Sequence, residues 1–215
     1  MTIQKGAEIM TYGEARDKTL QIINQYSLGG AAIPASYNGQ QDYLNRIPGL
    51  LNDALIFITS WIRPLPASEP LDFNYAGKVG GLYRFDLPDD FYEIDPAGLL
   101  VVDGERVYHS TTYSIVGDDY ILTPYIEGLV TLKYHCNPRL LLPRPEDDDT
   151  LDGPEMVQNA LPYYAASQLV MQDDAYAHTA IYNEWRTRVE MLRPKPHPER
   201  GAVYDTYGFD IWGDF

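Results

Sequence analysis

The chain has 215 residues, of which 31 are acidic and 16 are basic, so its formal net charge at neutral pH is −15. This acidity argues against a protein that reads nucleic-acid sequence or adheres to anionic membranes, because both need a basic surface. Apolar residues make up 45% of the chain, which excludes wholesale disorder, and the longest apolar run, 54–58, is too short to span a membrane.

Two helices are predicted first, over residues 11–26 and 39–62. Thr11 and Glu14 match a capping box, in which the glutamate side chain returns to the amide of the threonine. Apolar residues follow at helical spacing in both segments. Pro48 lies inside the second apolar stripe, so we expect it to kink or divide that helix.

The middle of the chain changes from helical to strand-like patterning. Short segments rich in β-branched or aromatic residues alternate with turn sequences such as Asp103-Gly104 and 117–119. Repeated short strands at this spacing are typical of a small sandwich or barrel. The predicted strands are 82–87, 98–103, 106–110, 113–116, 120–123 and 128–135.

The helical pattern then returns, and two more helices are predicted over 153–172 and 174–193. Asp152 and Glu155 mark the start of the first, and the acidic pair 173–174 marks the turn into the second. Because neither helix pair can bury its apolar stripe alone, the four helices are expected to pack together. The predicted core residues are Leu51, Leu55, Ile58, Leu161, Leu169, Ile181 and Trp185.

The predicted fold is therefore α+β, with a four-helix bundle formed by the N- and C-terminal helix pairs. The bundle domain comprises residues 1–66 and 150–193, and the inserted β-sandwich or barrel comprises residues 67–149. Residues 194–215 are interpreted as an extended C-terminal tail, because they have three prolines by residue 198 and no regular period.

The tail also carries five aromatic residues, although it cannot offset its own ordering entropy in isolation. These side chains either pack back onto their own bundle or bind a partner. The prolines favour the second outcome, because they stiffen an extended exit from the last helix. The candidate partner-binding residues are Tyr204, Tyr207, Phe209, Trp212 and Phe215.

The sequence contains no recognisable catalytic, phosphate-binding, dinucleotide-binding or zinc-protease motif. The acidic run 146–149 fits a calcium loop poorly, since Asn159 stands where a bidentate glutamate is required. The carboxylate pairs 89–90 and 118–119 are typical of turns. His135 and Cys136 are adjacent on a predicted strand and point to opposite faces. We therefore expect no enzyme, no metal site and no cofactor.

The helical segments resemble a known family, the head-to-tail connector (adaptor) proteins of tailed bacteriophages, which includes the tail tubular protein A group. The resemblance lies in the stretches MTYGEARDKTLQIINQYS, YNGQQDYLNRIPGLLNDALIFI and LPYYAASQLVMQDDAYAHTAIYNEWRTRVEML, about half of the chain. In the last stretch it rests on a Leu-Pro step, a Tyr/Ala-rich helix, an acidic turn and bulky residues on the final helix. Those residues are Leu161, Pro162, Tyr163, Tyr164, Ala165, Asp173, Asp174, Ala180, Tyr182 and Trp185.

The resemblance implies a structural virion protein that forms a ring, typically twelve-fold, under the portal and joins the bacteriophage head to the tail. It implies three partners: the portal protein, a tail or tail-completion protein, and further copies of the chain. The aromatic tail residues then bind the portal or a neighbouring subunit. The expected location is the virion neck, with the host cytoplasm during assembly. An acidic channel surface lets DNA pass at ejection without adhering to it.

Two other classes of function stay open from the residues alone. One is a sugar- or peptide-binding β module on a helical stalk, which exposed tyrosines and acidic turns also suit. The other is a carboxylate hydrolase that uses acids of the β insert. A ring in solution favours the connector, glycan binding by a monomer favours the module, and turnover lost on one Asp substitution favours the hydrolase.

Overall fold

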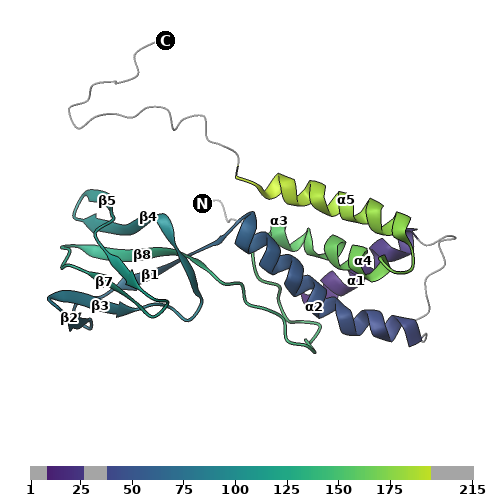
Figure 1. Cartoon of the computed structure of the whole chain (residues 1–215), viewed down its shortest axis with the longest axis horizontal. Helices are drawn as coiled ribbons and strands as arrows, with labels where there is room; N and C mark the ends of the chain where they lie inside the picture. Colours follow the sequence, from purple (N-terminus) through teal and green to yellow (C-terminus); the bar gives the residue numbers. More distant parts are fainter. Residues whose placement is uncertain (1–8, 27–37, 195–215) are drawn as a thin grey trace, which may run out of the picture.

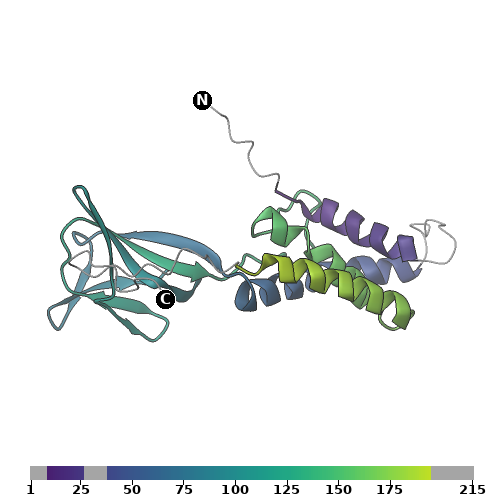
Figure 2. The ribbon, with the colours of Figure 1, turned by 90° about the horizontal axis from the view of Figure 1, so that it is seen from above.

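A computed structural model describes residues 9–26 and 38–194 of the chain, and the structural statements below concern those residues. The helices gather at one end of the molecule and the strands at the other, joined by two connections (Figure 1). Each end has its own hydrophobic core, one formed by helical side chains and one formed between the sheets. The same separation is visible from above (Figure 2). Helices and antiparallel sheets in separate parts agree with the coarse α+β prediction.

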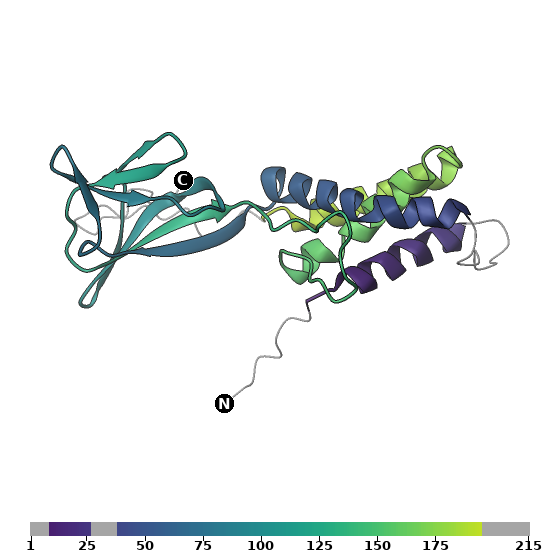
Figure 3. The same cartoon turned by 90° about the horizontal axis from the view of Figure 1, so that it is seen from below.

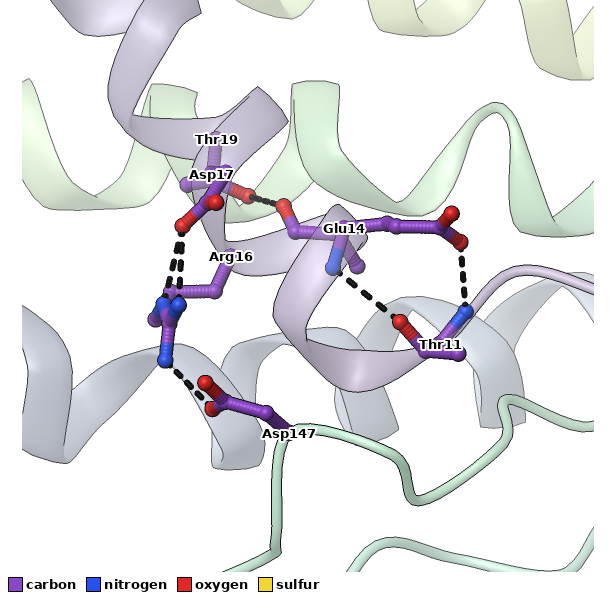
Figure 4. A network of polar contacts seen from close by, with 7 residues as sticks. Thr11, Glu14, Arg16, Asp17, Thr19 and Asp147 are labelled. Atoms are coloured by element: carbon purple, nitrogen blue, oxygen red, sulfur yellow. Dashed lines mark hydrogen bonds and ion pairs between the residues drawn. The ribbon is translucent and has the colours of Figure 1, made fainter.

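Local sequence signals define the helix starts. At the first helix, the Thr11 amide donates to Glu14 Oε2 at 2.9 Å and the Glu14 amide donates to Thr11 Oγ1 at 3.3 Å, which is the predicted capping box (Figure 4). At the last helix, the Asp174 carboxylate accepts from two backbone amides at 3.0 and 2.9 Å. The described helices are α1 (Tyr12–Tyr26), α2 (Asn38–Trp61), α3 (Glu155–Gln158), α4 (Leu161–Val170) and α5 (Ala175–Leu192).

The predicted four-helix bundle is wrong. The segment 153–172 is not one helix, because α3 ends at Gln158 and α4 begins only at Leu161. The ten-residue α4 lies at the centre, and α1, α2 and α5 each pack against it. A bundle would instead have four helices of similar length, each packed along its neighbours. α2 also continues through Pro48, so the predicted division of that helix does not occur.

The composition of α4 explains its central position. Seven of its ten residues are buried, and three of these are the small residues Ala165, Ala166 and Ser167. A helix that is apolar on most of its surface is buried on all sides rather than along one stripe. The sequence prediction failed here because it assigned a single amphipathic stripe to a helix of which only Tyr163, Tyr164 and Gln168 are not buried.

The seven residues predicted as the helical core are all buried in one cluster, so that prediction is confirmed even though the helix arrangement differs. None of them is more than 4% exposed: Leu51, Leu55, Ile58, Leu161, Leu169, Ile181 and Trp185.

The strands form two antiparallel four-stranded sheets, with orders β1-β8-β4-β5 and β2-β3-β7-β6. Leu99, Val101 and Leu132 from the first sheet and Ile121 from the second are at most 1% exposed and share one core, so the sheets pack face to face. The strands are β1 (Leu65–Leu71), β2 (Gly77–Val79), β3 (Leu82–Asp86), β4 (Phe91–Asp103), β5 (Arg106–Ser110), β6 (Ser114–Val116), β7 (Tyr120–Thr123) and β8 (Leu129–Cys136).

One glycine makes the long strand β4 possible. The pairing register between β4 and β8 shifts between Ile94 and Leu99, and Gly98 within this irregularity has a φ of +72°. A Cβ at this position would lie 2.8 Å from the Ser110 carbonyl oxygen. Both the backbone conformation and the close approach therefore require glycine.

The chain returns from the sheets to the helices through residues 137–152, which we call the return strap. The strap is held against α2 by the Asn52 side chain, which donates to the Leu141 carbonyl and accepts from the Leu141 amide, both at 2.9 Å. It is pinned to the start of α1 by two backbone bonds, one of which joins the Tyr12 amide to the Asp149 carbonyl at 2.7 Å. The Arg16 side chain pairs with Asp147 of the strap (Figure 4).

A single buried amide connects the end of this strap to the N-terminal segment. Gln158 is 2% exposed, and its Nε2 donates to the carbonyls of Leu151 and Gly153, both at 2.8 Å. Its Oε1 accepts from the Met10 amide at 2.9 Å. One buried side chain thus satisfies three backbone groups, of which one lies on a buried residue and two on half-buried residues.

We expect Gln158→Leu to lower the free energy of unfolding by about 2–4 kcal/mol, because it leaves three backbone groups of the interior without partners. The matched control is Gln168→Leu, on the half-buried side of α4, which should change stability by no more than about 0.5 kcal/mol. Denaturant unfolding of both variants measures the difference. Equal stabilities for the two variants would contradict the role assigned to Gln158.

We expect Trp185→Ala to lower the free energy of unfolding by about 3–5 kcal/mol, because it empties a site in the helical core. Trp61→Ala is the control, since that side chain is 77% exposed and its removal leaves no cavity. Equilibrium unfolding in urea, followed by circular dichroism, compares the two. A Trp185 variant as stable as the Trp61 variant would show that the helical core is misassigned.

Candidate binding surface

The partner-binding residues predicted from the sequence lie outside the described residues, so their role stays a prediction. They are Tyr204, Tyr207, Phe209, Trp212 and Phe215. The described residues carry other candidate features, namely acidic side chains, a histidine beside a cysteine, and two groups of aromatic side chains.

The acidic residues considered for catalysis or metal binding have structural partners. Asp90 Oδ1 accepts from the Tyr134 hydroxyl at 2.9 Å, and the backbone carbonyl of Asp119 accepts from the Leu87 amide at 2.9 Å, next to the last residue pair of β3 and β7. In the return strap, Asp152 Oδ2 accepts from the Arg139 amide at 2.7 Å. These contacts support turns and the strap rather than a shared site.

The histidine and the cysteine on β8 do not act together. His135 Nδ1 lies 3.0 Å from Glu93 Oε1, and its Nε2 lies 3.8 Å from Asp95 Oδ2. Burial raises the pKa of the neighbouring Cys136 thiol, and the charge of Asp90 raises it further. A thiol with a raised pKa is a poor nucleophile at neutral pH.

Within the described ranges, no cluster of three or more His, Cys, Asp and Glu side chains is placed to hold a metal ion. Among the helices of those same ranges, none combines the length and the apolar character needed to cross a membrane.

An aromatic cluster extends from the helical core to the surface between α2 and α5. Trp185 of α5 is 4% exposed, and its ring lies 5.6 Å from that of Phe57, 5.0 Å from that of Tyr164 and 5.1 Å from that of Tyr182, measured between centroids. Its indole Nε1–H is buried without a hydrogen-bond partner among the described residues. Trp185 is therefore held by packing, with three aromatic rings among its neighbours.

The same cluster reaches solvent on α2. Phe57 is 43% exposed and Trp61, one helical turn further on, is 77% exposed. We call Phe57, Trp61 and the half-buried Tyr182 the aromatic flank. The sequence analysis missed it, because Phe57 and Trp61 stand four residues apart at the edge of the apolar stripe, where the pattern alone does not mark them as exposed.

A second group of aromatic residues lies in the β part, where half-buried rings adjoin the exposed Tyr75 and Tyr125. Phe73 packs edge-to-face against Tyr83, Phe85 and Tyr125, with centroid distances of 5.0 to 5.3 Å. Two shallow hollows adjoin this group and share residues 70–72, and each is bordered by an exposed tyrosine, Tyr75 in one and Tyr125 in the other. We call Tyr75 and Tyr125 the aromatic tip.

Charge is distributed unequally between the two parts of the molecule. Residues 67–137, which contain nearly all the strands, carry 12 acidic and four basic side chains. The other described residues, 9–26, 38–66 and 138–194, carry 14 acidic and nine basic side chains. The β part therefore carries the larger share of the net negative charge of the described residues.

The hydrogen bonds of two tyrosines make the free energy of unfolding depend on pH in the alkaline range. The hydroxyls of Tyr43 and Tyr134 donate to Asp173 at 2.7 Å and to Asp90 at 2.9 Å. Burial, and then these carboxylates, raise the pKa of each tyrosine to about 12. The folded state thus favours the neutral phenol, so this stabilisation is complete below about pH 10 and is lost as the pH rises toward about 12.

We therefore expect the free energy of unfolding to fall between about pH 10 and pH 12, and to fall less steeply in Tyr43→Phe and Tyr134→Phe. Tyr75→Phe is the control, because that ring is 89% exposed and its phenol has no such partner among the described residues. Urea unfolding at a series of pH values gives the slopes. Unchanged slopes in both variants would contradict the assignment.

No protein-family model matches the sequence, and a search of curated proteins finds no match. The connector resemblance accordingly stays a prediction, to be judged from the residues and the geometry above.

Proposed function

We propose that the chain is a structural head-to-tail connector of a tailed bacteriophage, a ring subunit that docks under the portal and leaves a channel for DNA. The observation that carries the proposal is the packing of the stretches that resemble the connector family. They lie in α1, α2, α4 and α5, and α2 and α4 are separated by about 100 residues of sequence. The described parts of all three stretches nevertheless share one hydrophobic core, from which the β part projects.

Exposed aromatic side chains support an assembly role. The aromatic flank lies on the helices and the aromatic tip on the sheets, so the chain offers two different surfaces that a neighbour can bury. Head-to-tail rings need two different surfaces on each subunit, whereas a two-fold dimer uses one. Tyrosine and tryptophan are also enriched at protein interfaces.

The charge distribution supports passage of DNA without binding. A channel lined by the acidic β part would repel phosphate groups, whereas a basic lining would retain them. The proposed partners are the portal protein, a tail or tail-completion protein and further copies of the chain. The proposed location is the neck of the virion, reached after assembly in the host cytoplasm.

The tail residues are proposed as the assembly segment, which binds the portal or an adjacent subunit of the ring, with Tyr207, Phe209 and Trp212 as its anchors. We expect deletion of residues 200–215 to leave the melting temperature of the isolated protein nearly unchanged, because the segment cannot fold alone. The same deletion should abolish attachment to the portal, measured by co-sedimentation. Met191→Ala, which removes a side chain 67% exposed on α5, is the control that should attach normally.

Two results would contradict this assignment. Attachment that survives the deletion would show that the anchors lie elsewhere. A deletion that unfolds the protein would show that the tail belongs to the fold of its own chain.

One observation favours a second candidate, a sugar- or peptide-binding module. The two tyrosines of the aromatic tip border adjoining hollows that also contain polar groups of Asp72, Asn74 and Arg84. Aromatic faces beside polar groups suit a sugar ring, which has apolar faces and hydroxyl edges. A monodisperse monomer that binds on a glycan array would favour this candidate over the connector.

A further inference from the structure

The aromatic flank carries two large exposed aromatic side chains one helical turn apart on α2. Trp61 is 77% exposed and Phe57 is 43% exposed, and both lie on the side of α2 from which the ring of Phe57 contacts Trp185 of α5. Exposed tryptophan next to a well-packed aromatic cluster is the composition of an interface hot spot. The flank therefore provides a rigid platform, because its inner rings are fixed in the helical core.

Positive charge borders this platform on α5. The Arg188 guanidinium covers the Tyr163 ring, 4.0 Å from its centroid, on the side of α5 where Lys18 of α1 also approaches that ring. Successive residues of a helix are rotated by about 100°, so Arg186 and Arg193 lie on the other side of α5 from Arg188. Arg186 stands one helical turn after Tyr182 of the aromatic flank, and Arg193 stands two turns after Arg186. Arg193 pairs with Glu190 at 2.7 Å in an exposed contact, and Arg186 makes no ion pair with a described residue.

The residues that follow the described chain have the complementary chemistry. Residues 201–215 contain five aromatic side chains, three aspartates and no lysine or arginine. Aromatic rings suit Phe57 and Trp61, and aspartates suit the two arginines that border them.

The length of the chain after α5, and the point at which it leaves the helix, also allow it to reach a neighbouring molecule. The C-terminal ends of α2 and α5 lie at the same end of the helical part, next to the sheets (Figures 1 and 3). Arg193 has left the helix, with a ψ of 134°, and 21 residues follow Pro194. Fully extended, they span about 70 Å, enough to reach an adjacent molecule. From the sequence alone, the prolines at 194, 196 and 198 predict a stiff start to this segment.

We propose that the aromatic flank is the docking site for residues 201–215 of a second copy of this chain. Tyr207, Phe209 and Trp212 pack against Phe57 and Trp61, while the acidic residues of the segment face the arginines of α5. Each copy then gives its segment to one neighbour and receives that of the other, a head-to-tail contact that builds rings. The inference deepens the proposed connector function, on which the closed ring rests.

The test is the mass of the full-length chain in solution as a function of concentration, measured by sedimentation. Trp61→Ala should raise the concentration needed for assembly at least about 30-fold, as expected for loss of a hot spot. Met191→Ala, on the other side of α5, should assemble like the unaltered chain. Because Trp61 and Met191 are both largely exposed, both variants should keep the unaltered circular dichroism spectrum.

A charge exchange separates docking on a second copy from docking on the chain's own flank. Arg186→Glu with Arg193→Glu should give monomers, because the altered flank then repels the acidic segment. Asp205→Lys with Asp210→Lys should also give monomers. An equimolar mixture of the two should assemble, since each segment then meets a flank of opposite charge on the other chain.

Three results would overturn the inference: an unaltered chain that stays monomeric at every concentration, Trp61→Ala that assembles normally, or a charge-exchange mixture that stays monomeric. Other results test the connector function separately from the inference. A chain that assembles through this contact but does not attach to the portal keeps the inference and refutes the connector. A chain that attaches to the portal, but whose assembly is unchanged by Trp61→Ala, keeps the connector function and refutes the inference.

Discussion

The buried amide of Gln158 is the contact on which the arrangement of the helical part depends. It satisfies the Met10 amide and the carbonyls of Leu151 and Gly153, so one side chain joins the entry to α1, the end of the return strap and α3, of which Gln158 is the last residue. Because Gln158 is only 2% exposed, its removal would leave these groups poorly paired. Because the N-terminal segment and the strap are fixed together, α1 and α2 pack on either side of α4, and the sheets project from one end.

Local chemistry was predictable from the sequence, and packing partners were not. The Thr11–Glu14 capping box formed as expected, and β5 and β7 begin and end at their predicted residues. β1 was missed because Pro66 and Pro70 argue against a strand, yet an edge strand tolerates proline where no ladder hydrogen bond is needed. The central position of α4 was missed because hydrophobic periodicity identifies one apolar side of a helix. It does not show that most of the residues of a helix are buried.

The candidate binding surface shows the same division. Five aromatic residues in a segment without periodicity pointed to a partner-binding tail, and that prediction lies beyond the described residues. The aromatic flank was missed because Phe57 and Trp61 fall within a strongly apolar helix, where exposed and buried aromatic side chains look alike until the neighbours of α2 are known. Its connection to Trp185 depends on contacts between α2 and α5, which are more than 100 residues apart.

The central claim is that this chain forms a ring that bridges a portal and a tail. Electron micrographs of the purified protein mixed with the portal of its bacteriophage test it most directly. We expect closed rings of this chain stacked coaxially on the portal, with an open central channel. Micrographs that show bare portals beside a monodisperse monomer would contradict it.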